Sequence, residues 1–439
     1  MHDKKRNPMR VNIKKHILFL VLVMLTFTQC DEAYSPNKKE VKSILKTLSS
    51  DEMRGRQAFT PDINLAADFI ASEFKTAGLT PLSELENFKQ VFTLNEISIA
   101  SHSILVGNKT IGENSFFALL NGKIIDWNNA SIETLEIKKD DHFRAKFREY
   151  TDSESDLLVF VDPNHSDVFG RYQSFFSKPS RALKENEVGN VVFILSEKST
   201  SYSIKIEPQI HKKELANVVG TIPGKRTNEY VLFSAHHDHI GIRTVVEGDS
   251  IANGANDNAS GVTAVIELAK HFSSLNTPER TLVFTTFTAE EAGGYGAQYF
   301  SKQFNPEEIV AMFNIEMIGK PAVSGPNTAW ITGYEKSTFG ELLSQSTEGT
   351  EFEFYADPYP QQNLFYRSDN ATLARLGVPA HTISTTPIDV DKDYHQVSDE
   401  YNTINIDHLI NTINAISRAA QGIVSGRDTP TRVDVELVD

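Results

Sequence analysis

The stretch EYVLFSAHHDHIG (229–241) decides the fold, because an apolar, β-prone run ends directly in histidines and an aspartate. Two later stretches have the same form: RTLVFTTF (280–287) leads into TAEEAGG, and IVAMFNIEM (309–317) carries a glutamate near its end. Continuous apolar runs of this length are typical of buried strands in a mostly parallel sheet. In such sheets functional residues gather at the carboxyl ends of the strands. The pattern therefore predicts a functional site at one edge of a sheet.

Helices are expected between these strands. SGVTAVIELAKHFSSL (260–275) and INLAADFIASEFKTAGL (63–79) both repeat apolar residues at helical spacing. Alternating strands and helices predict an α/β fold with a doubly wound, mostly parallel sheet flanked by helices. Short strand-like runs fill residues 96–209, and none of them ends in a motif like those described above. We interpret that segment as an inserted β-rich domain.

The bulk properties limit the class of protein. A chain of 439 residues suits two domains, and its 40% hydrophobic and 23% charged residues predict a soluble globular body. The formal charge of −15 argues against a nucleic-acid surface. We expect the main domain to comprise residues 31–95 and 210–425, followed by a mobile acidic tail at 426–439.

The N-terminal segment differs from the rest of the chain. Residues 1–15 carry six Lys and Arg side chains, and an apolar run follows at 17–27. This order is typical of a secretory signal peptide, and the run is too short to favour a membrane-spanning helix. The only cysteine, Cys30, comes next. Its position predicts a bacterial lipoprotein with residues 1–30 as signal peptide; the alternative is a cleaved signal with an incidental cysteine. We expect export to the periplasm or cell surface, lipid-anchored at Cys30 or otherwise secreted.

The histidine cluster offers one metal ligand. If the strand continues through His236 and His237, their side chains point to opposite faces, so only one faces the site. Asp238 could accept the second imidazole N–H and fix the tautomer of a metal-bound histidine. A histidine-rich loop without metal is the alternative interpretation of this stretch alone.

Two loops supply carboxylates. GANDNASG (254–261) places Asp257 where it could bridge two cations, although an Asx-turn with a helix cap gives the same pattern. In TAEEAGG, Glu290 and Glu291 follow a buried strand, where adjacent carboxylates repel each other unless a cation is present. One could ligate a metal while the other takes a proton from a bound water. A solvated acidic loop is the alternative here.

Two further side chains complete the set. Glu316 lies at the end of an apolar run, where a carboxylate is costly to bury unless it is paired or bound to metal. DYHQVSD (393–399) adds His395 in a polar loop. A histidine in such a loop is, by itself, more often structural or exposed. Together the five stretches offer the imidazoles and carboxylates that two neighbouring zinc ions need.

In this order, the five motifs resemble the secreted zinc aminopeptidase family with two co-catalytic metals. Its relatives include glutamate carboxypeptidase, the transferrin receptor ectodomain and glutaminyl cyclase. The resemblance covers roughly residues 40–95 and 210–425. Members often carry an inserted protease-associated domain, and the segment at 96–209 takes that place here.

The resemblance also implies the ligands of two Zn²⁺ ions per chain. One ion would be held by His236, Asp257 and Glu316, and the other by Asp257, Glu291 and His395. Asp257 would then bridge the two ions. The motif ending in Ser-Gly selects this aspartate as the bridge and makes Asn256 only its neighbour.

Glu290, directly before the ligand glutamate, matches the general base of the family. The family's usual residue at the position of Glu316 is aspartate, so this chain departs from the pattern by one methylene. YRSDN (366–370) is similar to a segment near the family's pocket. That similarity implies a second-shell or substrate-binding role for Asp369, beside the one inferred for Asp238.

These observations predict a hydrolase, a zinc-dependent exopeptidase that acts as an aminopeptidase on peptide substrates through metal-activated water. Two alternatives share the fold: a single-zinc enzyme like glutaminyl cyclase, and a carboxypeptidase. A third belongs to another class, a non-catalytic binding protein like the transferrin receptor. We expect no nucleic-acid partner, and membrane contact only through the lipid anchor.

Overall fold

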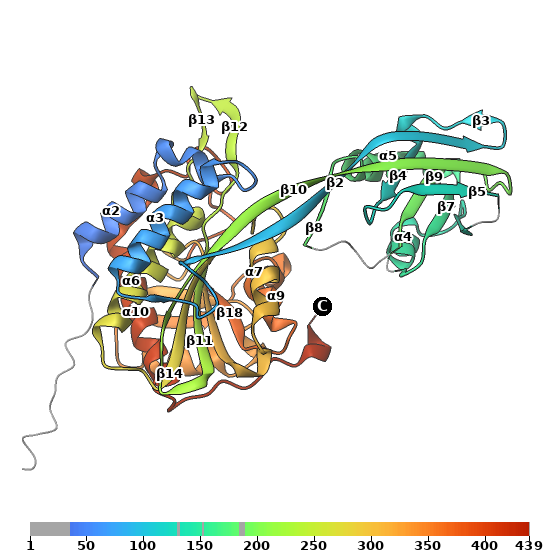
Figure 1. The fold of residues 1–439 in the computed structure, drawn as a ribbon. Helices are drawn as coiled ribbons and strands as arrows, with labels where there is room; N and C mark the ends of the chain where they lie inside the picture. Colours follow the sequence, from blue (N-terminus) through green and yellow to red (C-terminus); the bar gives the residue numbers. More distant parts are fainter. Residues whose placement is uncertain (1–35, 130–131, 152, 184–188, 439) are drawn as a thin grey trace, which may run out of the picture. The chain divides into compact units, whose positions relative to one another are not determined.

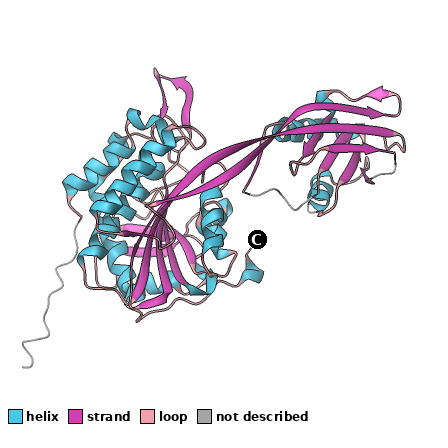
Figure 2. Ribbon diagram, in the orientation of Figure 1, coloured by secondary structure: helices cyan, strands magenta, loops and turns pink. Residues whose placement is uncertain are grey.

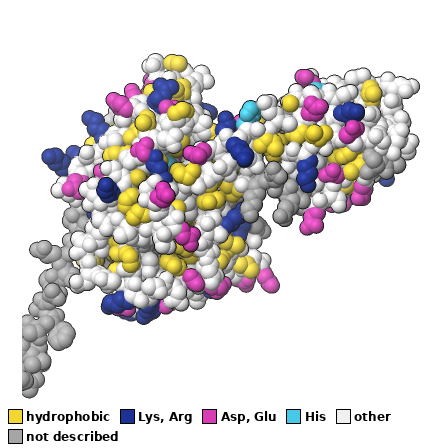
Figure 3. All heavy atoms as spheres, in the orientation of Figure 1, with side chains coloured by type: hydrophobic (Ala, Val, Ile, Leu, Met, Phe, Trp, Pro, Cys, Tyr) yellow, Lys and Arg dark blue, Asp and Glu magenta, His cyan; other side chains and the backbone are white. Residues whose placement is uncertain are grey.

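A computed structural model describes residues 36–129, 132–151, 153–183 and 189–438 (Figure 1). The predicted signal peptide and Cys30 lie outside the described residues. Within these ranges no helix is both long and apolar enough to cross a membrane. On the face that Figure 3 shows, basic and acidic side chains are interspersed.

A large mixed sheet forms the centre of the main domain (Figure 2). Its main path runs in the order β17 (Glu353–Ala356), β16 (Thr328–Ile331), β18 (Ala380–Ser384), β15 (Ile309–Ile315), β11 (Arg226–His236), β14 (Arg280–Phe287), β10 (Tyr202–Ile222), β2 (Lys89–Val106) and β3 (Lys109–Thr110). Strands β18, β15, β11 and β14 are parallel neighbours, whereas β10 pairs antiparallel with β14. Short strands β1 (Thr80–Pro81) and β5 (Ile125–Asn128) pair with β10, and β8 (Ser180–Ala182) pairs with β2.

Helices cover both faces of this sheet, which confirms the predicted α/β class. One face carries α2 (Lys38–Leu48), α3 (Asp62–Thr76), α6 (Gly261–Ser274) and α10 (Ile406–Val424), and the other carries α7 (Tyr295–Phe300) and α9 (Asn370–Ala374) (Figure 1). Helix α8 (Phe339–Ser346) packs against α10. The parallel strands lie at the centre of the sheet, and antiparallel pairings appear on both sides of them.

An aromatic cluster joins the parallel strands to α6. The ring of Phe233 in β11 lies 5.2 Å from that of Phe284 in β14 and 5.0 Å from that of Phe313 in β15. Phe272 of α6 lies 5.3 Å from the same ring. Full burial of a phenylalanine contributes about 1.5–3 kcal/mol. This packing fixes the three strands whose carboxyl ends carry the charged motifs.

The segment predicted as an insert contains a second sheet, in the order β4 (Phe116–Leu119), β9 (Val191–Leu195), β7 (Leu157–Val161) and β6 (Glu133–Ile137). Helices α4 (Phe143–Thr151) and α5 (Ser166–Phe176) accompany these strands. Phe117 and Phe193 belong to their hydrophobic core. The predicted boundaries at 96 and 209 fall inside β2 and β10, which run antiparallel over almost their whole lengths.

The C-terminal segment packs against the main domain, contrary to the mobile tail expected from its charge. Arg432 donates hydrogen bonds to the main-chain oxygens of Pro306 and Ile309, at 3.0 and 2.9 Å. Val433 is buried, and its N–H bonds to the oxygen of Gly377. These contacts come from single residues scattered through an acidic stretch, so composition did not reveal them.

Candidate metal centre

Three neighbouring strands end at the same edge of the sheet and carry the predicted side chains there. His236 is the last residue of β11, and Glu316 directly follows β15. Glu290 and Glu291 lie in the turn after β14. Asp257 comes from the irregular turn 255–260, which precedes α6. The strands of the parallel sheet therefore bring together residues that are up to 80 positions apart.

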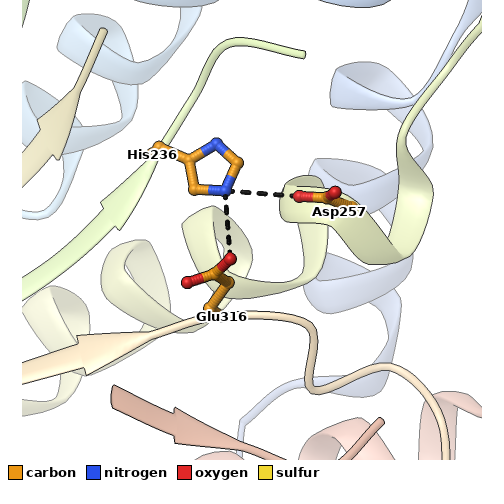
Figure 4. Close-up of side chains that lie close together, drawn as sticks. All are labelled: His236, Asp257 and Glu316. Atoms are coloured by element: carbon orange, nitrogen blue, oxygen red, sulfur yellow. Dashed lines mark ion pairs between the residues drawn. The ribbon is translucent and has the colours of Figure 1, made fainter. Parts of the chain in front are cut away.

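The first group consists of His236, Asp257 and Glu316 (Figure 4). His236 Nε2 lies 3.3 Å from Asp257 Oδ1 and 3.8 Å from Glu316 Oε1. The Nδ1–H of His236 donates to the main-chain oxygen of Asp238 at 3.1 Å, which leaves Nε2 free to face the carboxylates. Both Nε2 and Asp257 Oδ1 are buried without a hydrogen-bond partner. A cation between them would satisfy both atoms.

The second group shares the other oxygen of Asp257. Its Oδ2 lies 3.3 Å from His395 Nε2 and 3.8 Å from His239 Nδ1. Glu291 faces the same two rings, with Oε1 2.8 Å from His239 Nδ1 and Oε2 3.1 Å from His395 Nε2. Asp257 thus presents one oxygen to each group, as the bridging role requires.

The electrostatics of both groups also fit a cation. Although burial opposes the effect, the carboxylates of Asp257 and Glu316 raise the pKa of His236 well above its ordinary value. Burial likewise opposes the rise at His395, but Asp257 and Glu291 bring its pKa to about 10. In the absence of metal these carboxylates therefore favour protonated imidazoles. Buried imidazole and carboxylate donors are also the set that zinc binds, so the residues fit two such ions.

Asp238 positions the loop that carries the two glutamates. Its carboxylate accepts the main-chain N–H of Glu290 at 3.0 Å and that of Glu291 at 3.3 Å. The prediction that this carboxylate accepts the imidazole N–H is wrong for His236, because Asp238 Oδ1 lies 3.9 Å from Nδ1 and the main-chain oxygen makes that contact. The chain turns after His236, which brings the carbonyl to the ring and directs the carboxylate to the glutamate loop.

The proton-handling candidate, Glu290, lies in an acidic and buried setting. Burial raises the pKa of Glu290 well above its ordinary value, and the carboxylates of Glu316, Asp369 and Glu291 act in the same direction. Burial also raises the pKa of Asp369 to about 8, and both its carboxylate oxygens lack a hydrogen-bond partner. Asp369 therefore lies near the centre but belongs to neither group of ligands.

Two asparagines hold the turn of Asp257 against the end of β15. Asn256 Oδ1 accepts the N–H of Gly319 at 2.9 Å, and Asn258 Oδ1 accepts that of Met317 at 3.2 Å. The Asn258 amide also donates to the oxygen of Ile315 at 3.0 Å. These bonds bracket Glu316 on both sides. The asparagines thus hold the turn in place, which explains why amide side chains flank the candidate bridging aspartate.

Arg56 connects the loop that begins at His237 with the loop that precedes Asp257. Its buried guanidinium donates to the main-chain oxygens of His237 at 2.9 Å, Asn253 at 2.6 Å and Gly254 at 3.0 Å. Burial lowers the pKa of Arg56 to about 10, against the opposing effect of nearby carboxylates such as Asp257. The sequence analysis missed this residue because nothing in its local pattern marks it.

Three residues beside the site have a positive φ although they are not glycine: Ala289 at 58°, Met317 at 55° and His395 at 58°. Each lies next to a predicted site residue or is one. Such conformations are strained for residues with a Cβ, and they concentrate at functional sites. This backbone supports the functional interpretation independently of the charges.

A cavity opens beside the first group. Its empty volume is about 460 Å³ including the open mouth. Its lining combines apolar walls with hydroxyl groups: Glu316, Met317, Trp330, Thr332, Leu364, Arg367, Ser368, Thr382, Ser384, Thr386, Ile388 and Tyr394. The ring of Tyr394 stacks on that of His395, with centroids 4.0 Å apart. The cavity therefore adjoins the first group directly through Glu316, whereas Tyr394 separates it from His395 of the second group.

The other two histidines of the HHDH stretch, His237 and His239, have different surroundings. Both ring nitrogens of His237 are buried without a partner, and burial lowers its pKa to about 3. Only His236 of the adjacent pair reaches the first group, and the strand ends at this residue. His239 reaches the second group, which the sequence analysis did not foresee. Its signal was the third histidine in HHDH.

The fold and the site define an α/β domain with two adjacent groups of candidate metal ligands at the carboxyl edge of its sheet. The sequence profile of Peptidase family M28 matches residues 217–420, which contain all the ligand candidates. Over this segment the chain is therefore similar to Peptidase family M28.

Curated relatives match parts of the chain. A probable zinc metalloprotease of Pyrenophora teres f. teres is 36% identical over 109 residues, which are 24% of this chain and 23% of that protein. A probable leucine aminopeptidase of Trichophyton verrucosum is 25% identical over 246 residues, which are 54% of this chain and 63% of the relative. The chain thus spans less than two thirds of the length of each.

Solved structures of aminopeptidases share the fold. The enzyme of Bacillus subtilis aligns with a TM-score of 0.55 and 15% identity, covering 90% of this chain and 96% of that one. An aminopeptidase from Aneurinibacillus sp. strain AM-1 aligns with a TM-score of 0.51 and 17% identity, covering 92% and 96%. At this identity the likeness concerns the fold alone.

Proposed function

We propose that this chain is a zinc-dependent exopeptidase that removes N-terminal residues from peptides. One observation carries the proposal: two groups of side chains that can ligate a metal share the buried Asp257, and Glu290 lies directly beside the second group's Glu291. Carboxylates and imidazoles arranged in this way suit two co-catalytic ions. The M28 match of the same segment and the names of the relatives support the assignment.

When bound, such ions lower the pKa of a coordinated water towards neutrality and polarise a carbonyl oxygen. Glu290 then accepts the proton of the attacking water and delivers it to the leaving amine. Burial and the neighbouring carboxylates raise the pKa of Glu290, so its carboxylate is a stronger base than an ordinary glutamate, which suits this transfer. Asp238 holds the Glu290 main chain in place during both steps.

The cavity supports an exopeptidase that binds a free amine. A substrate side chain can occupy the space between Trp330, Leu364 and Ile388, beside Glu316. The α-amine, as a cation, is attracted to the carboxylates of the centre. Tyr394 lines the same cavity, and burial together with nearby carboxylates raises the pKa of its phenol. Its hydroxyl therefore stays protonated and can donate to negative charge on the substrate.

A panel of aminoacyl p-nitroanilides, assayed with zinc analysis of the same sample, tests this function. We expect hydrolysis that disappears after chelation and returns with zinc, at two ions per chain. Cyclisation of an N-terminal glutamine with release of ammonia and without hydrolysis, at one ion per chain, would favour the glutaminyl cyclase alternative. Failure of the chelated protein to bind zinc again would favour a non-catalytic binding role.

We also propose that the protein works outside the cytoplasm, as a lipoprotein anchored at Cys30. The basic and then apolar residues before this cysteine support export. The protein would then hydrolyse peptides in the periplasm or at the cell surface. Mass spectrometry of the mature N-terminus tests the anchor: we expect an acylated Cys30, and a free terminus would contradict it.

A further inference from the structure

His239 brings a third imidazole to the metal centre, beyond the two that the resemblance implies. Its ring is buried, and Nδ1 lies 2.8 Å from Glu291 Oε1 and 3.8 Å from Asp257 Oδ2. These three side chains satisfy the distance requirements of a cation site by themselves. Nε2 of the same ring is buried without a hydrogen-bond partner, so only Nδ1 has a defined role.

The two groups therefore differ in their number of donors. The first contains His236, Asp257 and Glu316, whereas four side chains converge on the second: His239, His395, Asp257 and Glu291. We propose that His239 is a fourth protein ligand of the second ion, which makes that site closed and leaves the first site open. The inference rests on the proposed function, because it requires that both sites hold zinc.

General zinc chemistry gives this asymmetry a consequence. Zinc sites with four protein ligands are typically structural, whereas catalytic sites have three and keep a position for water or substrate. Imidazole is also a favoured donor for zinc, and the second site has two such rings against one in the first. We therefore expect the second ion to be held tightly and the first to be exchangeable.

The cavity lies on the side that this assignment requires. Of the ligand candidates among the described residues, Glu316 is the one that lines it. The open position of the first site can therefore face a substrate in the cavity. Asp257, Glu291 and His239 surround the second site on the buried side, with at most 12% of their side-chain surface exposed. Substrate thus meets the exchangeable ion.

A simpler role for His239 must be distinguished from ligation. At 2.8 Å from Glu291 Oε1, the Nδ1–H could merely donate a hydrogen bond and orient the carboxylate. The substitution His239→Asn separates the roles, because its amide keeps an N–H donor near the position of Nδ1. An amide is a poor zinc ligand compared with an imidazole. His239→Ala removes both functions.

The experiment measures zinc affinities of the metal-free full chain by competition with a chromogenic chelator. Wild type, His239→Asn and His239→Ala are compared, with His211→Ala as control because His211 is exposed on β10. Near-UV circular dichroism of each metal-free protein checks its fold. Co²⁺ in place of zinc reports the geometry, since four-coordinate cobalt absorbs visible light more strongly than higher coordination does.

We expect two unequal affinities in the wild type and in the control. In both His239 variants the tighter affinity should fall by more than the roughly 10–100-fold typical of losing a residue that only positions a ligand, and the cobalt absorption that belongs to the second ion should change. A His239→Asn protein that keeps the tight ion would overturn the ligand role, as would two equal affinities in the wild type. Neither result affects the proposed hydrolysis. A wild type that binds no zinc would contradict the proposed function as well.

Discussion

The carboxylate of Asp399 accepts the main-chain N–H of Asp257 at 2.9 Å. It also accepts the N–H of Asn256 at 2.9 Å, and so holds the turn in which the bridging carboxylate stands. Asp399 is the last residue of the DYHQVSD stretch that also carries His395. One short segment thus supplies a candidate ligand and fixes the position of another.

The substitution Asp399→Asn tests this support. The amide group would place N–H donors against the N–H groups of Asn256 and Asp257, so the turn should shift. We expect zinc affinity to fall by about 10–100-fold, as for other residues that position metal ligands. Chelator competition measures the change, with the exposed Asp140→Asn as control. Equal affinities in the two variants would show that the bond has no influence on the site.

Glu316 is the candidate ligand at which the sequence departs from the family that it resembles, and Glu316→Gln tests its proposed role. Removing the charge should leave one zinc ion per chain, because the first group loses an anionic donor. The metal-free variant should stay folded and unfold cooperatively, because glutamine keeps the shape of this side chain, which is 18% exposed. Zinc analysis and thermal unfolding measure both properties. Glu316→Asp, which keeps the carboxylate, should retain two ions; loss of both ions from Glu316→Gln would contradict the separate groups.

Arg56→Met tests whether the buried guanidinium supports the loops of the centre. The substitution leaves the main-chain oxygens of His237, Asn253 and Gly254 without their donors. Each unsatisfied buried acceptor costs about 1–3 kcal/mol, so we expect a loss of about 3 kcal/mol or more. Urea unfolding of the metal-free chain measures it, with the exposed Arg243→Met as control. Equal stabilities of the two variants would refute the role.

Acid should destabilise the fold through His381. Its Nδ1–H donates to the oxygen of Thr332, its Nε2 accepts from Ser337, and burial lowers its pKa from 6.5 to about 4. Between these values the unfolded chain binds a proton that the native chain excludes, so stability falls as the pH falls from about 6.5 to 4.

Replacing this histidine should flatten the pH dependence. In His381→Asn, the slope of unfolding free energy against pH should decrease by up to about 1.4 kcal/mol per unit across that range. Other buried histidines, such as His408, keep part of the slope. Urea unfolding at several pH values measures it. Parallel curves for wild type and variant would count against the assignment, and the exposed His211→Asn should give such curves.

Much of the fold and site could be predicted from the sequence, because apolar strands that end in charged residues leave a strong local pattern. His236, Glu290 and Glu316 stand at or just after such strand ends, and the structure brings their loops together. The extent of β2 and β10 could not be predicted, since charged and apolar residues alternate irregularly along them.

Arg56, Asp399 and His239 escaped the sequence analysis for a physical reason. Each acts through a loop, where the direction of a side chain does not repeat regularly along the sequence. Arg56 also bonds to a residue about 180 positions away in the chain. Asp238 shows the same limit: its motif was recognised, but the direction of its carboxylate was not.

The most direct test of the account is zinc analysis and turnover of Glu290→Gln, compared with the exposed Glu351→Gln. Glu290 is assigned to proton transfer and not to ligation, so the variant should keep two zinc ions. Its turnover of aminoacyl p-nitroanilides should fall by about 10²–10⁴-fold, the usual contribution of general acid–base catalysis. Near-normal turnover of Glu290→Gln with two zinc ions bound would contradict the proposed mechanism.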